Sequence, residues 1–259
     1  MPLSLYLREQ GDSGPVVVLL HGLFGSSANW GSIARDLSRH YRLLIPDLRN
    51  HGQSPHHADV SYAAMVGDLL ALLDEHQVAK AIVIGHSMGG KVGMHLALTH
   101  PQRVAGLAVV DMAPVAYKHN FEQVFRAFDA VDLNALQKRT DADAAMEQHL
   151  LQRGVRAFLQ QNLQRISGTW QWRVNLQALR DSQAQITGFD MPEGVQYAGP
   201  CCFIHGTLSD YVQPAYEADI QRFFPKSWLC PVKGAGHWVY AEKPDAFADC
   251  LQRFLITVR

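Results

Sequence analysis

The sequence has few of the features that mark a metal-binding or disulfide-rich protein. It contains only four cysteines, all in the last quarter of the chain, and none has the spacing of a zinc site. Adjacent cysteines rarely pair with each other, so we expect all four to be buried, reduced thiols. No two of the thirteen histidines are spaced as a ligand pair on one helix, and we expect no metal site. The cysteines are Cys201, Cys202, Cys230 and Cys250.

An excess of charge of one sign and long apolar runs are also missing. The 23 Lys and Arg residues nearly balance the 24 Asp and Glu residues, which argues against nucleic acid or an anionic membrane surface as a partner. No apolar run is long enough to span a bilayer, and the charged start of the chain is unlike a signal peptide. We therefore expect a cytoplasmic, monomeric protein that acts on a small molecule.

The chain does contain short apolar runs that alternate with helical patterns. This alternation is typical of an α/β protein with a mostly parallel central sheet flanked by helices. With 259 residues, 47% of them hydrophobic, the chain can bury a sizeable core. Helices are predicted after Ser61, after Ser87 and from Pro244. The predicted strands cover residues 16–22, 42–47, 81–87, 105–111, 201–206 and 228–234.

The alternation stops between residues 114 and 190, where helical patterns occur without a strong strand. Phe121, Phe125 and Phe128, for example, share one helix face. We therefore predict a core formed by residues 1–113 and 191–259, with a helical cap insertion formed by residues 114–190. Such a cap would cover the carboxyl edge of the sheet, where ligands of open α/β sheets bind.

A Gly-His-Ser-Met-Gly sequence at residues 85–89 follows the apolar run that begins at residue 81. A Gly-x-Ser-x-Gly segment between a strand and a helix forms a tight turn that exposes the serine, and its glycines avoid clashes with neighbouring elements. Ser87 is therefore the candidate nucleophile. Its alternative role is that of a helix N-cap, which the two flanking glycines make the weaker interpretation.

A serine nucleophile needs a base and an acid that orients the base. His237 follows the last predicted strand, in the Ser, Asp, His order typical of this architecture. Two aspartates compete for the acid: Asp111 ends the strand next to that of the nucleophile, and Asp210 follows the next strand along. We favour Asp111, because the usual acid position after that next strand is Ser209. Ser209 and Asp210 are then auxiliary residues near the histidine.

The tetrahedral intermediate also needs amide donors for its oxyanion. One is the N–H of Met88, the residue after the nucleophile, at the positive end of a helix dipole. The second is expected in the glycine-rich turn at residues 21–26, where Leu23 is favoured over Phe24.

Apolar side chains are expected to contact the acyl group, although the cap phenylalanines could equally serve ordinary packing. Lys91 and Arg173 are charges that could meet a polar head group, but a surface position or an ion pair is the simpler expectation for each. The apolar candidates are Phe24, Met112, Phe121, Phe125, Phe128 and Trp238.

Five motifs spread over residues 16–245 resemble the α/β-hydrolase fold, and more narrowly the YbfF-type bacterial esterases and their mitochondrial abhydrolase-domain relatives. The resemblance implies a triad of Ser87, Asp111 and His237, with Leu23 and Met88 forming the oxyanion hole. It also implies hydrolysis of acyl esters, or of acyl-CoA thioesters, without a cofactor. The motifs are HGLFGSSANW, PDLRNHGQS, GHSMGGK, VVDMAP and GAGHWVYAEKP.

Other activities of this architecture remain open to different degrees. A dehalogenase or epoxide hydrolase needs an aspartate where Ser87 stands, so these classes are excluded. A cofactor-free perhydrolase or a carbon–carbon bond hydrolase uses the same triad and stays open. A non-enzymatic ligand receptor is disfavoured, because every catalytic position is occupied.

Overall fold

Seven strands form one sheet in the order β1-β3-β2-β4-β5-β8-β9 in the computed structural model, which describes residues 1–258. All neighbouring strands are parallel except β1, which pairs antiparallel with β3 at the edge. The predicted fold class and all six predicted strands are confirmed, whereas β1, with a single apolar residue, was not predicted. The strands are β1 (Leu7–Gln10), β2 (Val16–Leu20), β3 (Arg42–Pro46), β4 (Ala81–His86), β5 (Val104–Val110), β8 (Cys201–Gly206) and β9 (Ser227–Val232).

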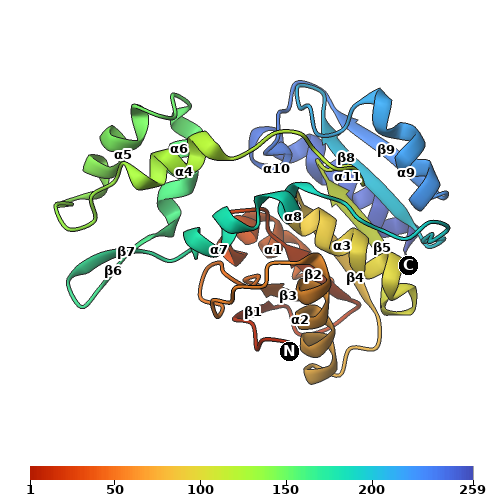
Figure 1. Ribbon diagram of the computed structural model, residues 1–259. Helices are drawn as coiled ribbons and strands as arrows, with labels where there is room; N and C mark the ends of the chain where they lie inside the picture. Colours follow the sequence, from red (N-terminus) through yellow and green to blue (C-terminus); the bar gives the residue numbers. More distant parts are fainter. Residues whose placement is uncertain (259) are drawn as a thin grey trace.

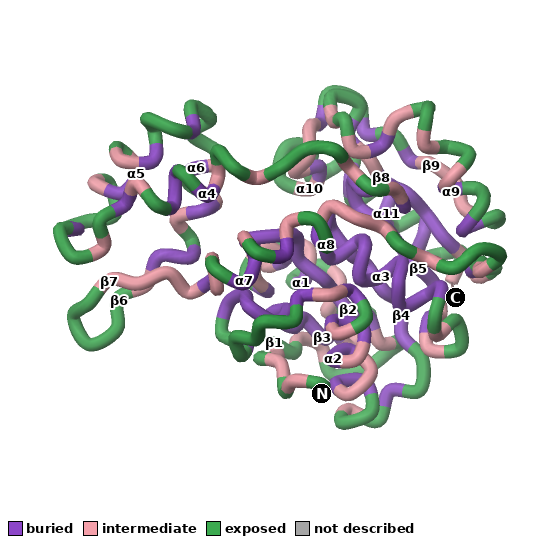
Figure 2. Tube along the Cα trace, viewed as in Figure 1, coloured by how far each residue is buried: buried purple, intermediate pink, exposed green. Residues whose placement is uncertain are grey.

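Helices cover both faces of this sheet (Figure 1). Because side chains alternate along a strand, Val18 and Leu20 of β2 pack on the side of α2, α3 and α9, whereas Val17 and Leu19 pack on the side of α1 and α11. The central strands and α3 are consequently almost wholly buried (Figure 2). These helices are α1 (Gly31–Leu37), α2 (Tyr62–Glu75), α3 (Met88–Thr99), α9 (Glu217–Phe223) and α11 (Pro244–Thr257).

The helix starts follow the predicted local chemistry. The Ser61 side chain accepts a hydrogen bond from the Ala64 N–H at the start of α2, and α3 begins directly after Ser87. Pro244 is the first residue of α11, where its missing N–H costs nothing. Within residues 1–258, no helix combines the length and apolar character needed to cross a membrane.

Residues 114–190, here called the inserted segment, are not wholly helical as predicted. They include a hairpin of two four-residue strands, which turns through Ser167 and Gly168, both with positive φ. Strands this short give too little alternation to be recognised in the sequence. Helices α4 to α6 and the hairpin lie to one side of the sheet, whereas α8 lies near α3 (Figure 1). The elements are α4 (Glu122–Asp129), α5 (Arg139–Glu147), α6 (Arg153–Leu159), β6 (Leu163–Ile166), β7 (Thr169–Trp172), α7 (Leu176–Asp181) and α8 (Gln183–Thr187).

The expectation of four reduced cysteines is wrong for one pair. Cys230 of β9 and Cys250 of α11 form a disulfide, with Cα atoms 6.1 Å apart. The packing of α11 against β9 brings together residues that lie twenty positions apart, which no spacing rule indicated. Cys201 and Cys202 are free and buried, as expected.

Candidate active site

Ser87 occupies the turn between β4 and α3 in a backbone conformation that is rare for residues with a side chain. Its φ is 52° and its ψ is −119°, and its N–H donates to the Val110 carbonyl over 3.0 Å. A Cβ on Gly89 would lie 2.5 Å from the Leu20 carbonyl oxygen, and a Cβ on Gly85 would collide with the Gly89 carbonyl. Both glycines are therefore required for the turn that presents Ser87.

Asp111 lies directly after β5, is fully buried and contacts His237. The Nδ1 of His237 donates to the Asp111 Oδ2 over 2.7 Å. The Ser209 hydroxyl donates to the same oxygen over 2.5 Å, and the Gly206 N–H donates to Oδ1 over 3.0 Å. Asp111 thus joins the ends of β5 and β8 to the histidine.

Asp210 makes no comparable contact in the part of the chain that the structure describes. Its side chain is exposed, and its backbone carbonyl accepts a hydrogen bond from Gln213. Of the two aspartates weighed from the sequence, the structure brings only Asp111 to His237. Ser209 lies beside the acid and donates to it.

The backbone around His237 is fixed by two residues that sequence reasoning missed. The Glu242 carboxylate accepts from the N–H groups of Gly236 (2.7 Å) and Trp238 (3.2 Å). The Nε2 of His86 donates to the His237 carbonyl over 2.9 Å, and burial lowers the pKa of His86 well below its ordinary value, so this imidazole is neutral. Glu242 ends α10 (Val239–Glu242), the short helix directly after the loop that carries His237. This nearness in the chain is the sequence clue that could have identified it.

The predicted oxyanion donors lie next to Ser87. Met88 is the first residue of α3, so its N–H has no partner within the helix. The loop that carries Leu23 passes close to the nucleophile, since a Cβ on Gly22 would lie 3.1 Å from the Ser87 Cβ. His21 supports this loop, because its Nδ1 donates to the Gly22 carbonyl and its Nε2 accepts from the Leu48 N–H.

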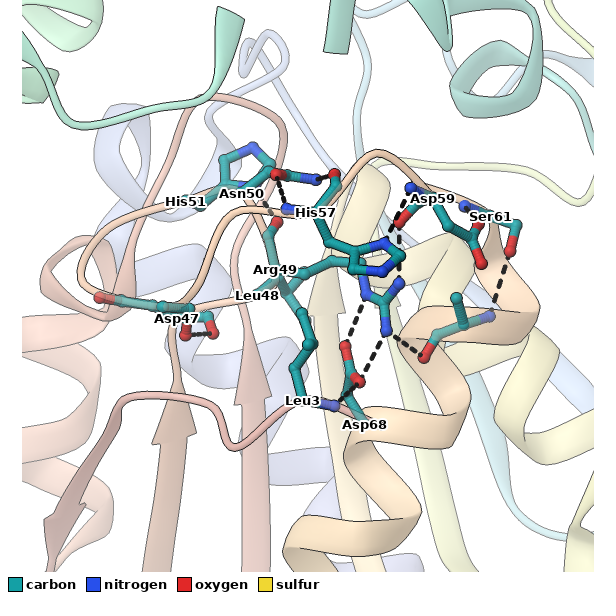
Figure 3. A network of polar contacts seen from close by, with 12 residues as sticks. Leu3, Asp47, Leu48, Arg49, Asn50, His51, His57, Asp59, Ser61 and Asp68 are labelled. Atoms are coloured by element: carbon teal, nitrogen blue, oxygen red, sulfur yellow. Dashed lines mark hydrogen bonds and ion pairs between the residues drawn. The ribbon is translucent and has the colours of Figure 1, made fainter. Parts of the chain in front are cut away.

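The loop after β3 forms a network of polar contacts with α2 (Figure 3) and, through Leu48, contacts the loop that carries Leu23, here called the oxyanion loop. Arg49 donates to both carboxylate oxygens of Asp68 over 2.7 Å, and both side chains are 1% exposed. Arg49 also donates to the carbonyls of Asp59 and Ala64, which ties the loop to α2. Leu48, whose N–H binds His21, immediately precedes Arg49, so the network fixes the position of the oxyanion loop.

Two small hollows flank Ser87. The histidine-side hollow, of about 30 Å³, is bordered by Ser87, His237, Asn29, Phe158, Trp238 and Tyr240, among others. The lysine-side hollow, of about 20 Å³, is bordered by Ser87, Met88, Lys91, Met112, Tyr117 and Phe121, among others. Each has room for little more than one water molecule. A larger groove of about 500 Å³ between α1 and α11 contains none of Ser87, Asp111 and His237.

The predicted substrate contacts fall into two groups. Trp238 borders the histidine-side hollow, whereas Met112 and Phe121 border the lysine-side hollow. Phe24 and Phe125 are buried, with ring centroids 5.7 Å apart, and border neither hollow. Their place is in the packing between the sheet edge and α4, which Phe128 also joins.

The expectation that Lys91 lies at the surface or in an ion pair is wrong. Lys91 is 1% exposed, and its ammonium donates to the carbonyls of Thr187 (2.6 Å) and Gly188 (2.7 Å). Arg173 is only partly buried and donates to the Gln164 side chain. Within residues 1–258, no three acidic, histidine or cysteine side chains are grouped to hold a metal ion.

Comparison with known proteins agrees with this geometry. The family model of the alpha/beta hydrolase fold matches residues 15–244. The chain is 40% identical to the esterase YbfF of Escherichia coli, over 96% of this chain and 95% of that protein. It is 38% identical to the sn-1-specific diacylglycerol lipase ABHD11 of Mus musculus, over 98% of this chain and 85% of that protein. A solved marine microorganism esterase superposes with a TM-score of 0.95 at 32% identity, covering 97% of this chain and 99% of its own.

Proposed function

Since this chain belongs to the α/β-hydrolase fold family and is an esterase- or lipase-type hydrolase, we propose that it cleaves carboxylic esters through an acyl-enzyme on Ser87. The observation that carries the proposal is the 2.7 Å hydrogen bond between His237 Nδ1 and Asp111. With Nδ1 committed as a donor, the Nε2 of His237 is left as the base, and it shares a hollow with Ser87.

In the proposed reaction, His237 takes the Ser87 proton as the hydroxyl attacks the ester carbonyl. Asp111 holds the imidazole in the productive tautomer and stabilises the imidazolium. The N–H groups of Leu23 and Met88 donate to the oxyanion. His237 then protonates the leaving alcohol, and a water that it activates hydrolyses the acyl-enzyme.

The two hollows suggest where each half of the substrate lies. The leaving group must lie near the histidine that protonates it, so we place the alcohol, or the thiol of a thioester such as an acyl-CoA, in the histidine-side hollow. The acyl group then occupies the lysine-side hollow. Met112 and Phe121 supply its apolar walls, whereas Phe24 and Phe125 support that wall through packing.

Esterase activity and serine labelling test the proposal together. Wild-type protein should hydrolyse p-nitrophenyl esters and be labelled by a fluorophosphonate probe. Ser87→Ala should abolish labelling and lower kcat by roughly 10⁴-fold or more, with an unchanged circular dichroism spectrum. The same ester panel run with peroxide, and with a carbon–carbon bond substrate, separates the alternative chemistries of this triad.

The acid is tested with a matched pair of variants. Asp111→Asn should lower kcat by roughly 10³- to 10⁴-fold, because the histidine then loses its tautomer control. Asp210→Asn should retain near-wild-type activity, since its carboxylate makes no contact with His237. An inactive Asp210→Asn beside an active Asp111→Asn would show that the acid is assigned wrongly.

A further inference from the structure

Lys91 places a buried positive charge one helical turn from the candidate nucleophile. The backbone N–H of Lys91 donates to the Ser87 carbonyl over 3.1 Å, so the two residues lie on the same face of α3. Both border the lysine-side hollow. The ammonium has three N–H donors, and the carbonyls of Thr187 and Gly188 engage two of them. The ammonium also lies over the Tyr117 ring, 4.8 Å from the ring centroid, and its third N–H has no hydrogen-bond acceptor among residues 1–258.

This charge has no acidic partner among residues 1–258, where no carboxylate lies within 4.0 Å of the ammonium. The carboxylate that belongs to the active site, Asp111, is engaged by His237, Ser209 and Gly206. Burial without a counter-ion lowers the pKa of Lys91 to about 7. An unpaired cation at this depth is costly, and an anionic ligand would offset that cost.

The other polar side chains around the lysine-side hollow are already engaged, which leaves Lys91 as the group that could meet an anion. The Tyr117 hydroxyl donates to the Tyr211 carbonyl over 2.6 Å, and Tyr211 and His119 hydrogen-bond each other over 3.2 Å. None of the residues that border this hollow is acidic. Because Lys91 lies one helical turn from Ser87, a short acyl chain is enough to join the two residues.

We propose that Lys91 binds a carboxylate at the far end of the acyl group, and that the preferred substrates are half-esters of short dicarboxylic acids. The inference rests on the proposed function, because Ser87 must attack the esterified end of the same molecule. Water is the co-reactant, and the products are the free diacid and the alcohol. The third N–H of Lys91 donates to the distal carboxylate while the ester carbonyl lies at the Leu23 and Met88 amides.

The test compares matched anionic and neutral esters. The monoethyl esters of the diacids from malonate to adipate are each assayed beside the ethyl ester of the corresponding monoamide, which has the same shape without the charge. In wild-type protein, kcat/KM should be at least about tenfold higher for the best half-ester than for its amide, as expected for one charge-assisted hydrogen bond. In Lys91→Met the ratio should fall to about one, mainly through KM.

The ratio separates charge recognition from a merely structural role. If Lys91 only ties the inserted segment to α3, Lys91→Met lowers kcat/KM for both esters in proportion and leaves the ratio unchanged, which overturns the proposal. A wild-type ratio near one overturns it without any variant. Hydrolysis of ethyl butyrate by the wild type tests the proposed function separately, because that ester carries no distal charge.

Discussion

Arg49 and Lys91 are both buried basic side chains, but only one of them is neutralised. Arg49 forms a bidentate pair with Asp68, and the backbone carbonyls of Asp59 and Ala64 accept from two more of its N–H groups (Figure 3). Lys91 has two backbone carbonyls and no carboxylate. Both side chains are 1% exposed, so the difference lies in their partners and not in their depth.

The difference separates a charge used by the fold from a charge kept for a ligand. Removing one member of a neutralised buried pair leaves the other charge uncompensated, which is far worse than replacing both. Removing a cation that has no counter-ion instead relieves a desolvation cost. The two sites should therefore respond in opposite ways to the loss of charge, and the predictions below test this contrast.

The largest effect is expected at the neutralised pair. Asp68→Asn leaves the Arg49 guanidinium buried and unpaired, and it weakens the Leu3 N–H contact with the same side chain. We expect the free energy of unfolding in urea to fall by about 3–5 kcal/mol. The matched control is Asp74→Asn, which breaks the ion pair with Arg103 at a side chain that is 68% exposed and should cost about 1 kcal/mol or less. Equal losses for the two variants would contradict the distinction.

Lys91→Met should behave differently, with an effect that depends on pH. The pKa of Lys91 is about 7 in the folded protein and 10.5 in the unfolded chain. Between these values the unfolded chain binds the proton more tightly, so the free energy of unfolding rises with pH. From pH 7 to 8.5 the wild type should gain up to about 1 kcal/mol per pH unit relative to Lys91→Met. If the free energies of unfolding of the two proteins change with pH in parallel, the charge of Lys91 is compensated within the folded protein, which contradicts the contrast with Arg49.

Local patterns predicted the parts of the site that depend on neighbouring residues. The glycines around Ser87 and the apolar run before it define a strand-to-helix turn without any knowledge of distant residues. The choice between Asp111 and Asp210 could not be made from neighbouring residues alone, because it depends on how the distant strands β5 and β8 pair. The structure shows that pairing in the hydrogen bond from the Asp111 N–H to the Ile204 carbonyl.

Features made by distant segments could not be predicted. The burial of Lys91 depends on residues 187–188, nearly a hundred positions away, which cover it from the inserted segment. The hairpin of the inserted segment was missed because its strands are short and partly exposed. The Cys230–Cys250 disulfide depends on how α11 lies against β9, which helical periodicity alone does not define.

An effect of similar size is expected at His95, whose pKa is lowered mainly by burial. Burial, followed by the nearby Lys91 charge, lowers the pKa of His95 to about 4, and its ring stacks on Tyr62 at 4.7 Å. As pH falls from 6.5 toward 4, the unfolded chain takes up the proton first, so this histidine makes the fold less stable in acid. Between pH 6.5 and 5, His95→Gln should remove about 1–2 kcal/mol of the loss in unfolding free energy seen in the wild type. The control is His57→Gln, the same substitution at an exposed side chain. If His95→Gln loses stability in acid as steeply as the wild type, burial does not lower the pKa of His95.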